Sequence, residues 1–319
     1  MSKRAKLKRE KNMTYRKAPQ NYDEWLLDRQ QNPSIGASQS AAVLGVHPWM
    51  TAVELWNELV NGFQPKEDNL AMYLGREMEP ILRDLFQRET GMKVKQDNKI
   101  RIHDKYSFLT TNLDGMVVGE KVPVEFKTTA KKWDGEIPDH YFVQLQHQMM
   151  ITGSPYIYFA SLSMGYDKQI VVEKYNRDDK FITGLMENLV EFWNVNVEGK
   201  VPPECQNIAD ANLLYNKVSE DEIIQADDKI YNLAVQLRSL NERKSECDDE
   251  IKKIKLQLMT VLENKQVIEY NGHQLVTWKK TKDREFFDKD KFKKENPDIY
   301  NKYIYSKSGS RRFVLKKEL

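Results

Sequence analysis

The sequence predicts an α/β protein, with a mixed sheet flanked by helices, followed by one long helix and a small C-terminal module. Three observations indicate this organisation. Short β-branched runs lie between capped helical segments over residues 18–205, apolar residues repeat at three- and four-residue spacing over 219–264, and an Asn-Gly pair separates two alternating runs beyond residue 265. With 15 Tyr, 12 Phe and 6 Trp in 319 residues, the chain has ample side chains for a core.

The charge is unevenly distributed along the chain. The net charge is +2, but residues 1–17 and residues 279–319 each carry +7 and the remainder carries −12. Residues 1–17 are therefore predicted to be a basic flexible arm. Two basic ends suit a polyanionic partner such as nucleic acid, and solvated termini are the alternative.

Composition excludes several classes of protein. No apolar run approaches the roughly 18 residues of a membrane helix, and the N-terminus lacks the apolar segment of a secretory signal, so a cytoplasmic protein is expected. Two cysteines cannot build a disulfide framework, a Cys-rich zinc site or a four-Cys iron–sulfur cluster.

End signals predict the helices of the first domain. Thr51 and Glu54 form a capping box and Gly62 a stop, while Pro80 should bend its helix. The predicted helices cover 21–31, 37–44, 51–61, 69–90 and 138–151, and one more begins at Asn176 with Asp179.

Turn signals and β-branched residues predict the strands between these helices. Asp114-Gly115 is the clearest turn, and Val201-Pro202-Pro203 ends the domain, which we place at 18–205. The predicted strands are 93–96, 100–103, 108–112, 116–118, 122–128, 156–164 and 169–175.

After a linker at 206–218, the most regular segment of the chain is predicted to be a coiled-coil helix. Ser219 and Glu222 form a capping box, and an apolar seam of strict heptad spacing extends from Ile223 to Val261. The predicted helix covers 219–264, which gives about 44 residues and about 65 Å. Only Lys244 interrupts the seam. So long a helix needs a partner, either its own domain or another chain, and we expect an assembly role.

The C-terminal segment, 265–319, is predicted to be a small basic α+β module. Asn271-Gly272 indicates a hairpin between strands 267–270 and 274–278. A helix over 288–303, with Pro297 in its path, and a strand over 312–315 complete the prediction.

Several residues that often carry chemistry are expected to be structural. The sequence has no phosphate-binding loop, dinucleotide fingerprint, HExxH or GxSxG motif. His140 and His147 lie seven apart, whereas metal pairs on a helix lie three or four apart. For Trp49 and Trp56, burial in the core is favoured over contact with DNA bases.

A group of charged residues follows the Asp114 turn and suggests metal chemistry. In a strand, side chains alternate faces, so Glu125 and Lys127 share one face while Val124 and Phe126 share the other. Asp114, Glu125 and the backbone carbonyl of Phe126 offer the oxygen ligands that Mg²⁺ prefers, and Lys127 would orient or help deprotonate a bound water. An exposed edge strand with an ion pair is the alternative.

The surrounding motifs resemble those of the PD-(D/E)XK nucleases, and in particular the YqaJ-type viral recombinase family of the lambda-exonuclease-like group. The resemblance extends over nearly all of 18–205. It rests on IGASQSAAVLGVHPWMTAVELWNELVNG (35–62), LGREMEPILRDLF (74–86), TTNLDGMVV (110–118), VEFKTT (124–129) and HYFVQLQHQMMITG (140–153).

The resemblance implies a role for each matched residue and a restriction-endonuclease-like core. Glu79, Asp114, Glu125 and the Phe126 carbonyl would be metal ligands, with Lys127 and Gln144 beside them. Glu77 is the nearby acid that the motif does not use. Ser38 would bind a terminal 5′ phosphate together with an upstream arginine, and the nearest is Arg29.

The implied function is a DNA exonuclease that uses one or two Mg²⁺ ions, with Mn²⁺ as a substitute. It would act 5′→3′ on double-stranded DNA ends, leave 3′ single strands, work with a single-strand annealing recombinase, and form homo-oligomers. An endonuclease on the same core is one alternative. A non-catalytic DNA-binding or assembly protein, in which the long helix is the working part, is the other.

Overall fold

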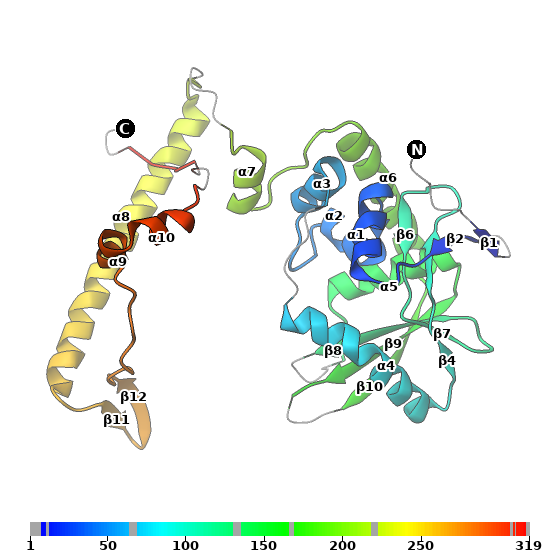
Figure 1. Cartoon of the computed structure of the whole chain (residues 1–319), viewed down its shortest axis with the longest axis horizontal. Helices are drawn as coiled ribbons and strands as arrows, with labels where there is room; N and C mark the ends of the chain where they lie inside the picture. Colours follow the sequence, from blue (N-terminus) through cyan, green and yellow to red (C-terminus); the bar gives the residue numbers. More distant parts are fainter. Residues whose placement is uncertain are drawn as a thin grey trace. The chain divides into compact units, whose positions relative to one another are not determined.

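The computed structural model describes residues 8–10, 13–63, 69–129, 135–165, 169–217, 223–306, 309 and 311–316. The chain divides into two compact units, Met1–Tyr215 and Asn216–Leu319 (Figure 1). Within the described ranges, no helix combines the length and apolarity needed to cross a bilayer.

The first unit is an α/β domain with two five-stranded mixed sheets, which confirms the predicted fold class. One sheet has the strand order β1-β2-β5-β6-β3 and the other β10-β9-β8-β7-β4. The strands are β1 (Lys8–Glu10), β2 (Met13–Lys17), β3 (Ile35–Gly36), β4 (Val94–Lys95), β5 (Lys99–Ile102), β6 (Leu109–Thr111), β7 (Gly115–Val117), β8 (Pro123–Thr129), β9 (Tyr156–Ser163) and β10 (Ile170–Asn176). In each sheet one neighbouring pair is parallel, β3 with β6 and β8 with β9, and the other pairs are antiparallel.

Most helices of this unit follow the predicted end signals, but the helix expected to be capped by Asn176 is capped by Asp178, which accepts the Phe181 N–H at 2.9 Å. Thr51 Oγ1 accepts from the Glu54 N–H, and Glu54 Oε2 accepts from the Thr51 N–H, both at 3.1 Å, so the capping box is confirmed. Pro80 lies inside α4, and Gly91 ends that helix with a φ of 71°. The helices are α1 (Tyr22–Gln31), the 3₁₀ turn Ala37–Gln39, α2 (Ser40–Val43), α3 (Ala52–Asn61), α4 (Leu70–Thr90), α5 (Asp139–Thr152), α6 (Asp179–Glu191) with a π-helical extension Phe192–Glu198, and α7 (Ile208–Leu214).

Strand β8 is buried between two helical layers. Val124 and Phe126 pack with Leu82 and Phe86 of α4. Helix α5 contacts β8, and Glu125 points toward it, since Gln144 of α5 donates to its carboxylate. Because β8 pairs with both β7 and β9, it is a central strand. The exposed-edge interpretation of Glu125 and Lys127 is therefore excluded.

Two predicted boundaries of the first unit are wrong. Residues 13–17 of the predicted flexible arm form β2, which pairs with β5, and Arg16 is buried there. At the other end the unit extends to Tyr215 rather than 205, because α7 packs against α3 and Asp210 accepts a 2.7 Å hydrogen bond from Thr51 Oγ1.

The second unit contains the long helix and the predicted hairpin. Helix α8 (Asp228–Leu262) has 35 residues and begins at the N-cap Asp227, so it is shorter than predicted, and the expected capping box at Ser219 and Glu222 lies outside the described residues. Strands β11 (Val267–Tyr270) and β12 (His273–Thr277) flank Asn271-Gly272, whose positive φ angles of 50° and 80° confirm the tight turn.

Beyond the hairpin, two predictions are wrong. The single helix expected over 288–303 is split into α9 (Lys289–Glu295) and α10 (Pro297–Lys302), because Pro297 has no N–H to continue α9 and instead begins a new helix. The strand expected at 312–315 is absent, and these described residues are irregular.

Candidate active site

The centre of the site is the carboxylate of Glu125, which is 2% exposed and accepts three hydrogen bonds. Its Oε1 accepts from Lys127 Nζ at 2.5 Å and from Gln144 Nε2 at 2.6 Å. Its Oε2 accepts from Gln148 Nε2 at 2.6 Å. A helical turn separates the two glutamines on α5, so one helix face holds both carboxylate oxygens. Glu125 is thus fixed in position by its neighbours.

Lys127 lies two residues beyond Glu125 and remains charged. Burial alone would lower the pKa of its ammonium, but the charges of Glu125 and Asp114, with the hydrogen bond to Glu125, raise that pKa above its ordinary value. The ammonium also lies 5.2 Å from the ring centroid of Tyr141. A permanently charged lysine suits stabilisation of negative charge better than removal of a proton.

Asp114 reaches the same region from the turn before β7. Its Oδ2 accepts the Phe126 N–H at 2.8 Å, so the carboxylate is anchored to the backbone of β8. A glycine is needed next to it, because a Cβ at Gly115 would lie 2.4 Å from a methyl carbon of Val94. Burial and the nearby charge of Glu125 raise the pKa of Asp114 well above its usual range.

Glu79 approaches from α4, whereas Glu77 does not. Glu79 is half-buried, and burial followed by the charge of Glu125 raises its pKa, while Arg83 and Lys127 act in the opposite direction. Glu77 is exposed. The structure therefore brings Glu79, and not the neighbouring acid, into electrostatic contact with the Glu125 group.

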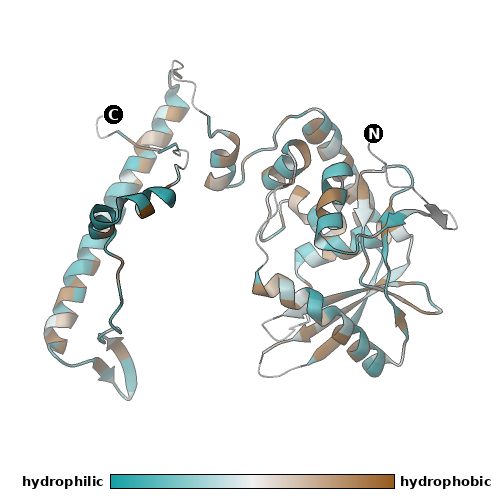
Figure 2. Cartoon of the chain, in the orientation of Figure 1, coloured by the Kyte–Doolittle hydropathy of each residue, from teal (hydrophilic) through white to brown (hydrophobic). Residues whose placement is uncertain are grey.

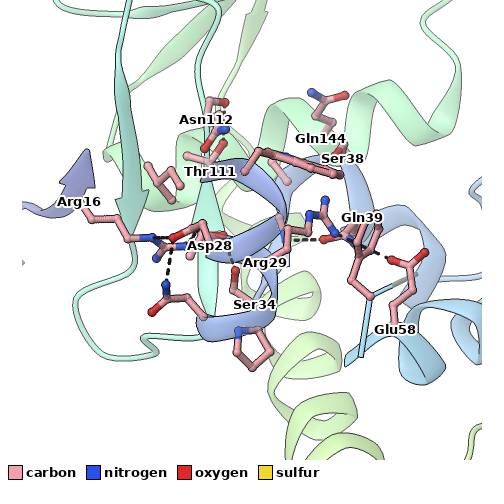
Figure 3. Close-up of a pocket in the computed structure, with 18 of the residues that line it drawn as sticks. Arg16, Asp28, Arg29, Ser34, Ser38, Gln39, Glu58, Thr111, Asn112 and Gln144 are labelled. Atoms are coloured by element: carbon pink, nitrogen blue, oxygen red, sulfur yellow. Dashed lines mark hydrogen bonds and ion pairs between the residues drawn. The ribbon is translucent and has the colours of Figure 1, made fainter. Parts of the chain in front are cut away.

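A cavity of about 300 Å³ joins this group to the predicted phosphate-binding residues. Ser38 is exposed on its wall, and Arg29 of α1 lines the same cavity, as Figure 3 shows. The Arg29 guanidinium lies 5.2 Å from the Trp25 ring and 5.1 Å from the Phe63 ring, and 3.8 Å from Glu58. Asp114, Glu125, Lys127 and Gln144 line the same cavity.

Sequence reasoning missed one residue of the site and gave no role to a second. Arg16 of β2 donates two 2.9 Å hydrogen bonds to the carboxylate of Asp28 and lines the cavity (Figure 3). The alternation in MTYRK was a strand signal that the high charge of the N-terminus obscured. Gln148 was visible one turn after Gln144 on the predicted helix. Its Oε1 has no hydrogen-bond partner among the described residues.

The histidines and tryptophans divide between structural and surface positions. His147 is fully buried, with Nδ1 2.8 Å from Ser40 Oγ, and burial lowers its pKa to about 3, so it is a neutral core residue. Trp56 is buried as predicted and donates to the Asn196 carbonyl at 2.7 Å. The core prediction for Trp49 is wrong, because it is 71% exposed and its ring lies 5.5 Å from that of His140.

The oxygen-rich donor set fits a hard divalent cation in its chemistry. Within the described ranges, no three His, Cys, Asp or Glu side chains are close enough together to hold an ion. However, the pKa values of Glu79 and Asp114 are both raised in part by the charge of Glu125. A cation beside these carboxylates would relieve their repulsion, and oxygen is the donor that Mg²⁺ prefers.

Comparison with known proteins identifies the family. Residues 24–155 match the YqaJ-like viral recombinase domain. The chain is 32% identical over 308 residues to a Bacillus subtilis (strain 168) protein named "Uncharacterized protein YqaJ", across 92% of this chain and 94% of that one. The chain therefore belongs to the YqaJ-like viral recombinase family.

Solved structures of two exonucleases are also similar to part of the chain. An alkaline exonuclease, LHK-Exo, from Laribacter hongkongensis is 26% identical with a TM-score of 0.46, covering 56% of this chain and 94% of its own. A phage-related exonuclease from Haemophilus somnus 129PT is 14% identical with a TM-score of 0.39, covering 55% of this chain and 100% of its own.

Proposed function

We propose that this protein is a Mg²⁺-dependent deoxyribonuclease that degrades double-stranded DNA from its ends, in the 5′→3′ direction, and leaves 3′ single strands. The observation that carries the proposal is the hydrogen-bonded Glu125, held beside a charged Lys127 on a central strand and facing a cavity that Asp114 and Ser38 also line. Membership of a viral recombinase family supports a DNA substrate, and the polarity rests on the resemblance to lambda exonuclease.

In this proposal the acids hold the metal, and the other residues position the reacting groups. Glu79, Asp114, Glu125 and the Phe126 carbonyl are the proposed ligands of one or two Mg²⁺ ions, for which Mn²⁺ can substitute. When bound, the metal supplies an activated water and neutralises charge on the phosphate. Lys127 adds a second positive charge for the phosphate, and Gln144 and Gln148 keep both oxygens of Glu125 in place.

End recognition is assigned to two further residues that line the cavity. Ser38 and Arg29 are the proposed contacts of a terminal 5′ phosphate. The side chain of Arg29 is held against Trp25 and Phe63, so little conformational freedom remains to be lost when a phosphate binds. The predicted domain at 18–205, extended to residue 215 and including Arg16, is proposed to carry the whole activity.

The proposed partners follow from the same proposal. A single-strand annealing recombinase would take up the 3′ strand that the nuclease exposes, and the reaction would take place in the cytoplasm, where the DNA lies. Homo-oligomerisation is proposed as well. Direct capture of a purified annealing recombinase by this chain would test that partnership.

The test compares linear duplex DNA with covalently closed circular duplex of the same sequence, with and without Mg²⁺, and with Glu125→Gln as the matched inactive control. We expect the linear substrate to lose nucleotides in Mg²⁺ while the circle stays intact. Cutting of the circle would support the endonuclease alternative. Binding without cutting of either substrate would support the non-catalytic alternative. In both cases the exonuclease proposal would be wrong.

A further inference from the structure

Helix α8 has an apolar seam whose centre the described residues of the second unit leave exposed. From Ser239 to Gln257 every residue of the helix is exposed. Leu240 and Ile254, which both lie on the seam, are each 57% exposed. Figure 2 shows the brown apolar segments that recur between teal polar ones along α8. Because most helical stability in proteins comes from packing of an apolar face, a 35-residue helix in this state needs a partner.

The spacing of the seam defines a heptad register. Positions a are Ile230, Leu237, Lys244, Ile251 and Leu258, and positions d are Leu233, Leu240, Cys247, Ile254 and Val261. Among the described contacts, Arg238 Nη2 of the first half donates to the Lys316 carbonyl at 3.4 Å, and Leu262 in the last turn is buried, but residues 239–257 between them are exposed within the second unit. The central heptads are therefore accessible to another helix.

The charges that flank the exposed centre indicate which helix fits. Positions g carry Arg243 and Glu250, and positions e carry Asp248 and Lys255. In a parallel in-register pair, each g side chain meets the e side chain five residues later on the partner. Arg243 then meets Asp248 of a second copy, and Glu250 meets Lys255. Twofold symmetry repeats both pairs, so all four charges are matched with opposite charges.

Antiparallel pairs and parallel pairs with a shifted register match fewer charges. An antiparallel pair sets g against g and e against e, so Arg243 and Glu250 can meet in one register and Asp248 and Lys255 in another, but not both together. A parallel pair shifted by one heptad sets Arg243 against Lys255, and these charges repel.

We propose that α8 pairs with α8 of a second copy of this chain as a parallel, in-register, two-stranded coiled coil centred on residues 240–257. The proposal goes beyond nuclease activity and does not depend on it. Lys244 lies at a seam position, where a single polar residue fixes register at some cost in stability, and its long side chain carries the ammonium out of the seam.

Cys247 provides a natural reporter of this arrangement. It is an exposed free cysteine at position d, where two in-register parallel helices face each other directly. A disulfide forms only when the two Cα atoms lie within about 7 Å. In the antiparallel register that pairs Arg243 with Glu250, Cys247 instead faces Lys244 of the other chain.

The experiment uses full-length protein with Cys205→Ser, so that Cys247 is the only thiol. Mild oxidation should yield a disulfide-linked dimer on non-reducing gels, and light scattering should report the mass of the assembly before oxidation. Arg243→Asp sets like charges against each other at two symmetric positions and should weaken association about tenfold. Adding Asp248→Arg to it restores opposite charges in the parallel register alone and should recover the dimer.

Lys253→Asp is the matched control, since it makes the same change of charge at position c, away from the seam, and should leave association unchanged. Three results would overturn the proposal. The first is a failure of Cys247 to cross-link at micromolar concentrations. The second is cross-linking of the Arg243→Asp protein to the same extent as its parent. The third is association of the Arg243→Asp, Asp248→Arg protein no stronger than that of Arg243→Asp alone, as an antiparallel pair requires.

Discussion

Replacing Glu125 separates its role in the reaction from its role in the fold. Glu125→Gln keeps the shape of the side chain but removes the charge. The new oxygen can accept from Lys127 and Gln144, which meet Oε1 in the native protein. The new amide N–H of residue 125 would then face the side chain of Gln148. Gln148 Oε1 has no hydrogen-bond partner among the described residues, so a rotation of the Gln148 amide lets this oxygen accept the new N–H.

The cost of this substitution is therefore mainly the weakening of charge-assisted hydrogen bonds to neutral ones. We expect Glu125→Gln to lower the free energy of unfolding by about 1–2 kcal/mol. Glu125→Ala should cost about 4 kcal/mol, because three donors with little access to solvent lose their acceptor together. Both variants should lose about 1000-fold in cleavage rate, since a proposed metal ligand is removed.

Urea unfolding followed by tryptophan fluorescence measures the free energy of unfolding. Single-turnover resection of linear duplex in Mg²⁺ measures the cleavage rate. DNA binding, measured without metal, should be nearly unchanged in Glu125→Gln, because phosphate contacts come from Lys and Arg elsewhere. The reasoning fails if Glu125→Gln keeps near-normal turnover, or if Glu125→Ala is no less stable than Glu125→Gln.

The remaining predictions concern four other positions. Without divalent metal at pH 7–8, Asp114→Asn should raise the urea concentration at the unfolding midpoint. The raised pKa of Asp114 means that the folded state disfavours its ionised form, which asparagine lacks. An unchanged or lower midpoint would contradict this. Ser38→Ala should slow resection of 5′-phosphate duplexes more than that of 5′-hydroxyl duplexes, and equal losses would instead indicate a structural role. Burial lowers the pKa of His147 from 6.5 to about 3, so the folded state accepts this side chain only in its neutral form. The free energy of unfolding should therefore fall as the pH drops from 6.5 to about 3, and it should fall less steeply in His147→Gln. Lys244→Leu should tighten self-association and admit other registers, which analytical ultracentrifugation and cross-linking would detect.

The strand carrying Glu125 and Lys127 could be predicted from sequence because its signal is local. Period-two alternation assigns the two charged residues to one face whatever the rest of the fold does, and the structure agrees. The capping box at Thr51 and the Asn271-Gly272 turn were predictable for the same reason.

Features that depend on distant partners could not be predicted in this way. Arg16 is buried only because Asp28, from the following helix, accepts both of its hydrogen bonds. Nothing in the first 17 residues distinguishes it from its basic neighbours. Tryptophan is usually buried, but Trp49 lies in the loop before α3 and is exposed at the surface. Contacts between residues far apart in the sequence, and not local propensity, determine whether these side chains are buried.

The segment that the family model matches, 24–155, is only part of the compact unit Met1–Tyr215. It ends just before β9, whose residues pair in parallel with β8 from Val124 to Thr129, and it begins after Arg16. A protein cut at those limits would expose the backbone of the strand that bears Glu125 and would remove the two hydrogen bonds that Arg16 donates to Asp28. Such a fragment would invite edge-to-edge aggregation, so expression of the domain should retain at least residues 13–215.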